Sequence, residues 1–286
     1  MKVSFPEYNK DWGKDNSKND IQYHRYYPIH YKYFYNILIK GGVDVDLIPV
    51  NKFDRKSQTD FEIIIDDHLC LVDFSDFQGL KCKEIEKYKA IFKFHYHPKN
   101  HGHIKNVYPF SPVNFHNWDL YKEIIKNNQY TATGKVCNQQ SPAGAAFDRR
   151  NKVRSLLIKE YADNLIWQPT SKQRFFENIS DCLVSICVPG ARNDMLDRGH
   201  GQYMFFGVCT ISPKLVTYLS YGKQPKAGVH YVECQPDYGD LIEKIEWCRN
   251  NPKECLQIGK NAKKLMEETS LPEKQVEWIK KCINNG

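Results

Sequence analysis

In the first half of the chain, large apolar side chains recur first at helical and then at strand spacing. Between Tyr31 and Leu38 they lie three or four positions apart, and the pattern stops at Gly41-Gly42. This predicts a helix whose C-terminal cap is glycine. Two apolar runs on either side of a short acidic turn at residues 66–68 then predict a hairpin. Strands are expected at residues 43–49, 61–65, 69–74 and 89–94, and a helix at 117–127.

In the second half, short apolar runs alternate with segments of helical periodicity. Strands that alternate with helices at this spacing predict a parallel, doubly wound α/β sheet. Three helices are expected to close the chain, and two begin with capping signals: Asn251 before Pro252, and Ser270 three residues before Glu273. Strands are expected at residues 131–137, 164–167, 182–188 and 208–211, and helices near 151–160, 172–178 and 239–249.

Composition narrows the class of protein without naming a ligand. The net charge of +7 favours anionic partners in general, such as nucleic acids or phosphorylated molecules. The ten cysteines are scattered among apolar residues and form no Cys-x-x-Cys pair, which indicates reduced core thiols and no zinc site. The N-terminal segment lacks an apolar core, and no apolar run approaches the roughly 18 residues that span a bilayer. We therefore expect a soluble, cytoplasmic protein without membrane insertion.

A candidate phosphate site follows the expected strand at residues 182–188. A turn with Gly190 and Arg192 leads to a glycine-rich segment at the start of a short helix. Free N–H groups and the dipole at a helix start attract a diphosphate, and an arginine can add a bidentate contact. A flexible loop with a solvated arginine is the alternative. The segment consists of Asp197, Arg198, Gly199, His200 and Gly201.

Two further groups leave the same edge of the expected sheet. Arg149 and Arg150 follow its first strand, and because loops at the carboxyl edge converge, they are expected to neutralise the same phosphates. Trp167, Gln168 and Pro169 end the next strand and are expected to contact the nucleotide base. An exposed arginine pair and a buried tryptophan are the alternatives.

The C-terminal part of the chain resembles a known family. The block GVHYVECQPDYGDLIEKIEWCRNNPKECLQIGKNAKKLMEE is similar to the C-terminal signature of the CAP10-like glycosyltransferases, which include protein O-glucosyltransferases and fungal capsule xylosyltransferases. Residues 230–232 (HYV) resemble the family's strand of the form HYVPV, and residues 240–247 (DLIEKIEW) resemble the helix that follows it. Upstream, Arg198 with residues 202–208 resembles the family's arginine-containing helix and next strand.

This resemblance implies a GT-B architecture, which consists of two Rossmann-like lobes with an interlobe cleft. It also implies an inverting transfer that needs no metal. The N-terminal lobe, expected at residues 1–129, would bind the acceptor, and the C-terminal lobe, expected at 130–269, would bind the nucleotide sugar. A C-terminal helix at 270–286 is expected to pack back toward the first lobe.

One departure from the family concerns the arginine that binds phosphate. In the family this arginine lies within the helix, whereas Arg198 lies one residue further from Gly207 and is followed by Gly-His-Gly. The phosphate role therefore falls to Arg198, His200 or Arg192. The sequence leaves these three open.

An inverting transfer also needs a base that deprotonates the acceptor hydroxyl. Asp73 and Asp76 lie at the end of the apolar run at residues 69–74, where a carboxylate can face the expected cleft. The family's base lies in a comparable segment at a strand end, and Ser75-Asp76-Phe77 matches that segment best. Asp73 remains a competitor, and turn or surface aspartates are the alternative for both.

Histidines cluster after the expected strand at residues 89–94. His95 and His97 share one face of an extended segment, but the segment offers no firm carboxylate or thiolate partner, so a metal site is not favoured. With Tyr96 they are expected to contact the acceptor sugar. Ordinary loop or packing residues are the alternative.

Together with the family resemblance, these features predict a glycosyltransferase without a cofactor that uses a UDP-sugar and a glycan or glycoprotein hydroxyl. The resemblance implies that the transfer is inverting and metal-independent and that the sugar is xylose or glucose. A bacterial or large-DNA-virus setting is expected, for example a chlorovirus glycan xylosyltransferase in the host cytoplasm. The alternative is a non-catalytic, basic nucleic-acid-binding protein, supported by the +7 charge and by the aromatic and basic residues at 24–35. The cations form no concentrated stripe, so nucleic acid is not the expected partner.

Overall fold

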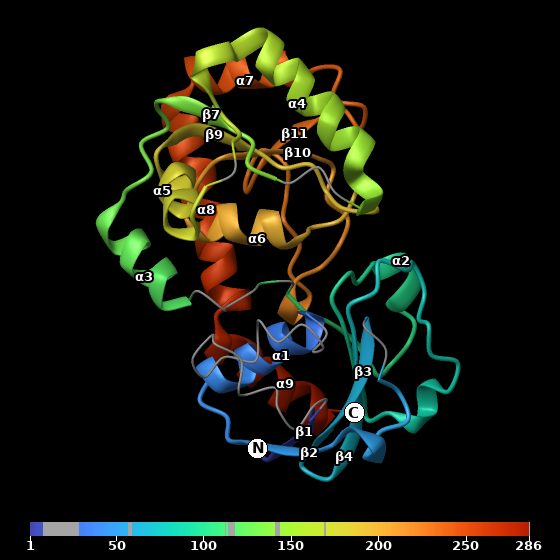
Figure 1. Cartoon of the computed structure of the whole chain (residues 1–286). Coiled ribbons are helices and arrows are strands. Elements are labelled where there is room, and N and C mark those ends of the chain that lie inside the picture. Colours follow the sequence, from blue (N-terminus) through green and yellow to red (C-terminus); the bar gives the residue numbers. More distant parts are fainter. Residues whose placement is uncertain are drawn as a thin grey trace. The chain divides into compact units, whose positions relative to one another are not determined.

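The computed structural model describes residues 1–7, 29–56, 59–111, 113, 118–140, 144–168 and 170–285. They form an α/β fold with two sheets, as predicted (Figure 1). The chain divides into two compact units, and each is described by itself. The first unit comprises Met1–His116, Tyr218–Lys223 and Thr269–Gly286, and the second comprises Asn117–Thr217 and Gln224–Glu268.

The sheet of the first unit has mixed strand directions. Its order is β2-β1-β3-β4-β5-β6, with β1 (Val3–Glu7), β2 (Val45–Pro49), β3 (Asp60–Ile65), β4 (His68–Asp73), β5 (Ala90–Lys93) and β6 (Val107–Pro109). β3 and β4 form the predicted antiparallel hairpin, and Asp66 and Asp67 supply its two-residue turn with φ of 46° and 65°. β1 also runs antiparallel to β3, while the other neighbours are parallel. This mixed sheet differs from the parallel sheet expected of a Rossmann-like lobe.

The helix α1 (Ile29–Lys40) ends where the glycine pair predicts. Val43 N donates to Leu38 O at 2.9 Å, and Gly42 adopts a φ of 78°, which a side chain would strain. The apolar side of α1 packs on the sheet, where the rings of Tyr31 and Phe61 stack with centroids 3.8 Å apart. The helical spacing of large side chains thus reflects burial in the core of this unit.

The last helix, α9 (Pro272–Asn285), belongs to the first unit. A Cβ at Gly41 would lie 2.5 Å from Val276 Cγ2, so the end of α1 touches α9 closely. Trp278 Nε1 donates to Pro109 O at 2.8 Å. The other short helices in the described part of this unit are η2 (Val50–Lys52), η3 (Ile85–Lys87), α2 (Pro98–His101) and η6 (Ser220–Gly222).

The sheet of the second unit is wholly parallel, as predicted. Its order is β11-β10-β9-β7-β8, with β7 (Lys135–Cys137), β8 (Leu165–Ile166), β9 (Cys182–Ile186), β10 (Thr210–Pro213) and β11 (Val232–Cys234). In chain order this is the arrangement 2-1-3-4-5 of doubly wound folds. The order reverses between β7 and β9.

Helices cover both faces of this second sheet (Figure 1). On one face, α4 (Phe147–Tyr161), α7 (Leu241–Asn250) and α8 (Pro252–Ser270) share a core cluster that includes Leu157 and Ile245. On the other, α3 (Trp118–Asn127), α5 (Lys172–Ser180) and α6 (Arg198–Phe205) share a cluster that includes Phe176 and Tyr203. The remaining turns are η4 (Gly144–Ala146) and η5 (Ala162–Asn164). The layers therefore match the predicted doubly wound architecture.

All ten cysteines are buried and free, which confirms the prediction of reduced core thiols. Among the described residues, no helix combines the length and apolar character that crossing a bilayer requires. The buried thiols and the lack of a bilayer-spanning helix in the described part of the chain both agree with a sequence in which polar segments separate the apolar runs.

Candidate functional site

The candidate site lies at the carboxyl ends of β7 and β9. Their connections leave in opposite directions, and ligands of open α/β sheets bind outside the strand ends at such a switch point. The loops that follow the two strands are joined by hydrogen bonds. Asn138 Nδ2 donates to Ile186 O at 3.2 Å, and Val188 N donates to Gln140 Oε1 at 2.6 Å.

Three arginines of α4 gather at this edge of the sheet. Arg149, Arg150 and Arg154 occupy the first two turns of the helix, and all three are half-buried. The carboxylate of Asp197 pairs with one of them, with its Oδ2 3.4 Å from Arg150 Nη2. Burial and the charge of Arg150 lower the pKa of Arg154. Positive charge is therefore in excess among these side chains, which favours an anionic ligand.

Backbone carbonyls of the loop after β9 orient two of the guanidinium groups. Arg149 Nη2 donates to Gly190 O and, at 3.2 Å, to Pro189 O. Arg150 Nε donates to Val188 O at 3.2 Å. Arg149 Nε is buried without a hydrogen-bond partner. Both cations are thus held in place by the protein, and preorganised cations stabilise developing negative charge with little rearrangement.

Arg154 was not predicted as a site residue. It lies four positions after Arg150 and therefore on the same face of the helix, a signal that the sequence contains. Its guanidinium lies over the ring of Trp167, 5.4 Å from the centroid, and the ring also packs on the core beneath α4. Trp167 is thus a packing partner of Arg154, whereas Gln168 is exposed and Pro169 lies outside the described residues.

The predicted phosphate turn is a capped helix start. Asp197 precedes α6, and its Oδ1 accepts from Gly199 N at 2.8 Å and from His200 N at 3.3 Å. His200 Nδ1 accepts in return from Asp197 N at 3.1 Å, which completes a capping box. The N–H groups that we expected to bind a diphosphate therefore already have an acceptor.

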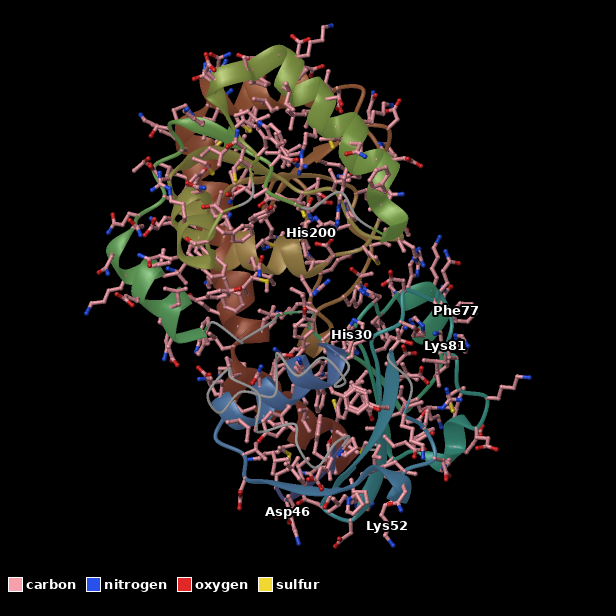
Figure 2. All side chains as sticks on the ribbon, viewed as in Figure 1. His30, Asp46, Lys52, Phe77, Lys81 and His200 are labelled. Atoms are coloured by element: carbon pink, nitrogen blue, oxygen red, sulfur yellow. The ribbon has the colours of Figure 1, made fainter. Side chains whose placement is uncertain are left out.

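His200 is a buried residue whose surroundings differ from those of a phosphate ligand. It is 0% exposed, and its Nε2 lies 2.8 Å from Ser212 Oγ in β10 (Figure 2). Burial by itself raises the pKa of Asp197, but hydrogen bonding to His200, including its backbone N–H, and the charge of Arg150 hold it well below its usual range. His200 therefore fixes the ionised cap, and we no longer assign it a contact with phosphate.

The other predicted donors of this turn differ in their surroundings. Arg192 forms a bidentate pair with Asp194, at 3.1 and 2.8 Å. Arg198 is exposed in the first turn of α6, and Gly201 is buried. A Cβ at Gly199 would lie 2.8 Å from a side-chain nitrogen of the loop after β7, so this glycine allows the two loops to approach. The arginines of α4 are therefore the centre of the candidate site.

In the first unit, Asp73 is a buried ion-pair partner. It ends β4, and its Oδ1 lies 3.0 Å from Lys93 Nζ of β5, with both side chains almost wholly buried. Lys93 Nζ also donates to Ser75 Oγ at 2.9 Å, and Ser75 N donates to Asp73 Oδ1 at 2.7 Å. This environment suits a structural carboxylate better than a base that must reach a substrate.

Asp76, in contrast, is accessible and paired with a histidine. Its side chain is 43% exposed, and its Oδ1 lies 3.1 Å from His95 Nε2. Burial opposes ionisation, but the hydrogen bond and charge of His95, and the charges of Lys93 and His30, keep the pKa of Asp76 below its usual value. An ionised carboxylate that solvent can reach is what a general base requires.

The neighbouring residues predicted to bind an acceptor have packing and capping contacts. Tyr96 is buried and stacks on Tyr218 with ring centroids 6.0 Å apart. His97 caps α2, because its Nδ1 accepts from Lys99 N at 3.2 Å. Their contact with an acceptor stays a prediction.

An exposed aromatic residue directly after Asp76 was not predicted as a site residue. Phe77 is 56% exposed and, with Lys81, lines a hollow of about 970 Å³ within the first unit (Figure 2). Glu62 and Tyr88 also line it, and Tyr88 Oη donates to Glu62 Oε1 at 2.7 Å. An aromatic ring among hydroxyl and charged groups is a surface to which a polyhydroxylated molecule can bind.

Comparisons with known proteins do not show a family. No protein-family model matches the chain, so the resemblance to the CAP10-like family stays a prediction. Uncharacterized protein 179R of Invertebrate iridescent virus 6 and Uncharacterized protein 035R of Invertebrate iridescent virus 3 are each 45% identical over 42 residues. These residues are 15% of this chain and 4% of each viral protein, so the chain covers little of their length. The crystal structure of TarM has a TM-score of 0.44 at 9% identity, covering 71% of this chain and 45% of that one, a likeness too low to support an assignment.

Proposed function

We propose that the protein is an inverting, metal-independent glycosyltransferase that transfers a sugar, xylose or glucose, from a UDP-sugar to a glycan hydroxyl. The observation that carries this proposal is the cluster of Arg149, Arg150 and Arg154 at the switch point of a parallel sheet. A departing nucleoside diphosphate develops negative charge, and held guanidinium groups at this place can stabilise it. The arginines would therefore take the role that a divalent cation has in other enzymes.

In the first half of the proposed reaction, the sugar separates from the diphosphate of the donor. The bond between the anomeric carbon and the diphosphate oxygen breaks, and its electron pair leaves with UDP. Arg149 and Arg150, which loop carbonyls already orient, would receive this charge. Asp197 keeps Arg150 near the site without neutralising the whole cluster.

We assign the base of the proposed reaction to Asp76. The acceptor hydroxyl loses its proton to the Asp76 carboxylate as its oxygen bonds to the anomeric carbon, which inverts that centre. His95 holds the carboxylate by a hydrogen bond of 3.1 Å. Asp73 is the weaker candidate because its carboxylate is already paired with Lys93.

The proposal is tested by ligand-dependent thermal stability. UDP at 100 times its dissociation constant is expected to stabilise the wild-type protein by about 2.7 kcal/mol, with or without EDTA. Arg150→Ala is expected to lose most of this shift. Arg150→Lys is expected to recover part of it, because a lysine keeps the charge but not the planar fork. Arg174→Ala is the matched control, since Arg174 is an exposed arginine on α5 that pairs with Glu177 at 3.4 Å.

Turnover of UDP-xylose and UDP-glucose by the same proteins completes the test. We expect hydrolysis or transfer by the wild-type protein, and a loss of about 100-fold or more in kcat for Arg150→Ala. A UDP response that needs Mg²⁺ would contradict the metal-independent mechanism. Salt-sensitive oligonucleotide binding without any response to UDP would instead support the nucleic-acid-binding alternative.

A further inference from the structure

Three cysteine side chains of the second unit meet in its core, away from the arginine cluster. Cys209 directly precedes β10, Cys248 lies on α7 and Cys255 lies on α8. All three are 0% exposed, and their sulfur atoms all lie within 4.8 Å of one another. Nothing in the proposed transfer reaction uses these thiols.

The backbone holds this group together through a contact between two glycines. A Cβ at Gly259 would lie only 1.9 Å from Gly207 O, so α8 and the segment before β10 touch main chain to main chain. Gly259 is one helical turn after Cys255, and Gly207 is two residues before Cys209. The contact therefore fixes the approach of the two thiols without relying on flexible side chains.

The turn between α7 and α8 places the third thiol. Asn251 N donates to Cys248 O at 3.3 Å, and Cys255 N donates to Asn251 O at 3.1 Å. Cys255 Sγ lies 3.6 Å from Cys248 O. Because these bonds connect the end of one helix to the start of the next, the two cysteines stay adjacent whenever both helices are packed on the sheet.

We propose that Cys209, Cys248 and Cys255 form a binding site for one thiophilic d¹⁰ cation, Cu⁺ or Zn²⁺. Thiolate sulfur is the ligand that both ions prefer. Sulfur ligands placed tetrahedrally around zinc at about 2.3 Å are about 3.8 Å apart, so the group needs to contract by at most about 1 Å. Binding replaces the thiol protons, which pass to solvent, and forms metal–sulfur bonds without any change of oxidation state.

The site would stabilise the fold instead of taking part in catalysis. Cys209 lies at the amino end of β10, whereas the arginine cluster lies at the carboxyl ends of the strands. Among the residues that the structure describes, one more group has ligand-like spacing, Cys187 with Asp197 and His200. Its aspartate and histidine already form the cap of α6, so it carries no such proposal.

Metal binding by the full-length wild-type protein is the first test. The protein is purified anaerobically without metal, given one equivalent of Zn²⁺ or of Cu⁺ as a soluble complex, and passed through a desalting column. Elemental analysis is expected to find one bound equivalent of at least one ion, and X-ray absorption is expected to find three sulfur neighbours around it. Retention of neither ion, or a first shell without sulfur, would overturn the proposal.

Variants identify the ligands. Cys248→Ser and Cys255→Ser are each expected to lose the bound equivalent, whereas Cys234→Ser, a buried cysteine of the same unit outside the group, is expected to keep it. Unchanged metal content in the first two variants would overturn the assignment. If a variant does not fold, the sulfur count on the wild-type protein decides. Because the readout is metal content, it is independent of whether the protein binds UDP.

Discussion

Asp73 and Asp76 are three residues apart, yet the same substitution is expected to affect different properties of the protein. Asp73→Asn leaves the buried ammonium of Lys93 without its counter-ion and is expected to lower the free energy of unfolding by about 3–5 kcal/mol. Asp76→Asn removes the proposed base and changes one contact with His95, at a side chain that is 43% exposed. It is expected to lower kcat by about 10²- to 10⁴-fold with little change in stability.

Denaturant unfolding and UDP-sugar turnover measure these two effects on the same preparations. Each variant serves as the control for the other, since both replace a carboxylate by an isosteric amide. Full transferase activity in both variants would show that neither aspartate is the base. Loss of activity in a folded Asp73→Asn protein alone would move the role to Asp73.

A buried histidine makes the stability of the first unit depend on pH. His101 is 0% exposed and accepts from His97 N at 2.9 Å; burial, and secondarily the charge of Lys93, lowers its pKa to about 4. The unfolded chain takes up a proton near pH 6.5 while the folded state stays neutral to about pH 4. This contribution to the free energy of unfolding is therefore complete above pH 6.5. It is lost as the pH falls toward 4, by about 2–3 kcal/mol.

The comparison with His101→Asn isolates this effect, because the asparagine amide oxygen can still accept from His97 N but carries no proton. Denaturant unfolding at several pH values is expected to show a smaller loss of stability between pH 6.5 and 4 in the variant. Parallel curves for the two proteins would mean that His101 does not titrate as its burial implies.

At the scale of elements, the contact between α8 and the segment before β10 has no room for a side chain. Gly259→Ala would normally favour a helix by about 1 kcal/mol. Here the new methyl would lie 1.9 Å from Gly207 O, a backbone atom that cannot rotate away. We expect a net loss of about 2 kcal/mol or more.

Thermal and denaturant unfolding measure this loss. The control is Gly79→Ala, whose new methyl would meet only the flexible ring of Phe77, at 3.3 Å, and which is expected to change stability by less than about 1 kcal/mol. Equal stability of the two variants would contradict the close packing of α8 on the segment before β10.

At the scale of the whole molecule, the first unit is assembled from three separate parts of the chain. Trp278 joins them: Nε1 donates to Pro109 O at 2.8 Å, and its ring lies 4.9 Å from the ring of Tyr221. Trp278→Ala is expected to lower the stability of this unit by about 3 kcal/mol. Amide exchange should then accelerate in β6, η6 and α9, while β7 to β11 keep their protection.

Trp247→Ala is the control for this exchange experiment, because Trp247 lies on α7 of the second unit and is 40% exposed. It is expected to leave the exchange of the first unit unchanged. Uniform acceleration across both units in Trp278→Ala would show that they unfold as one.

Local spacing was enough to predict most of the elements. The helix that ends at Gly41-Gly42, the β3–β4 hairpin and the first four strands of the second sheet follow from the burial of alternate or helically spaced side chains, which is a property of neighbouring residues. The parallel direction of the second sheet also follows, because each strand is followed by a segment long enough to cross over. Arg149 and Arg150 were predicted to lie at its carboxyl edge, and they do.

What the sequence by itself determined is therefore the type and approximate position of most elements, although β1 and β6 were not predicted and α4 begins at Phe147, before the expected start near residue 151. Only the tertiary structure decided which distant residues meet. In the structure Arg154 belongs to the arginine cluster, and Asp197 accepts hydrogen bonds from N–H groups of α6. Asp73 pairs with Lys93, and Cys209 lies close to Cys255. The physical reason is that periodicity records the burial of one face of an element, whereas the partner of that face depends on strand order and crossover direction across many residues.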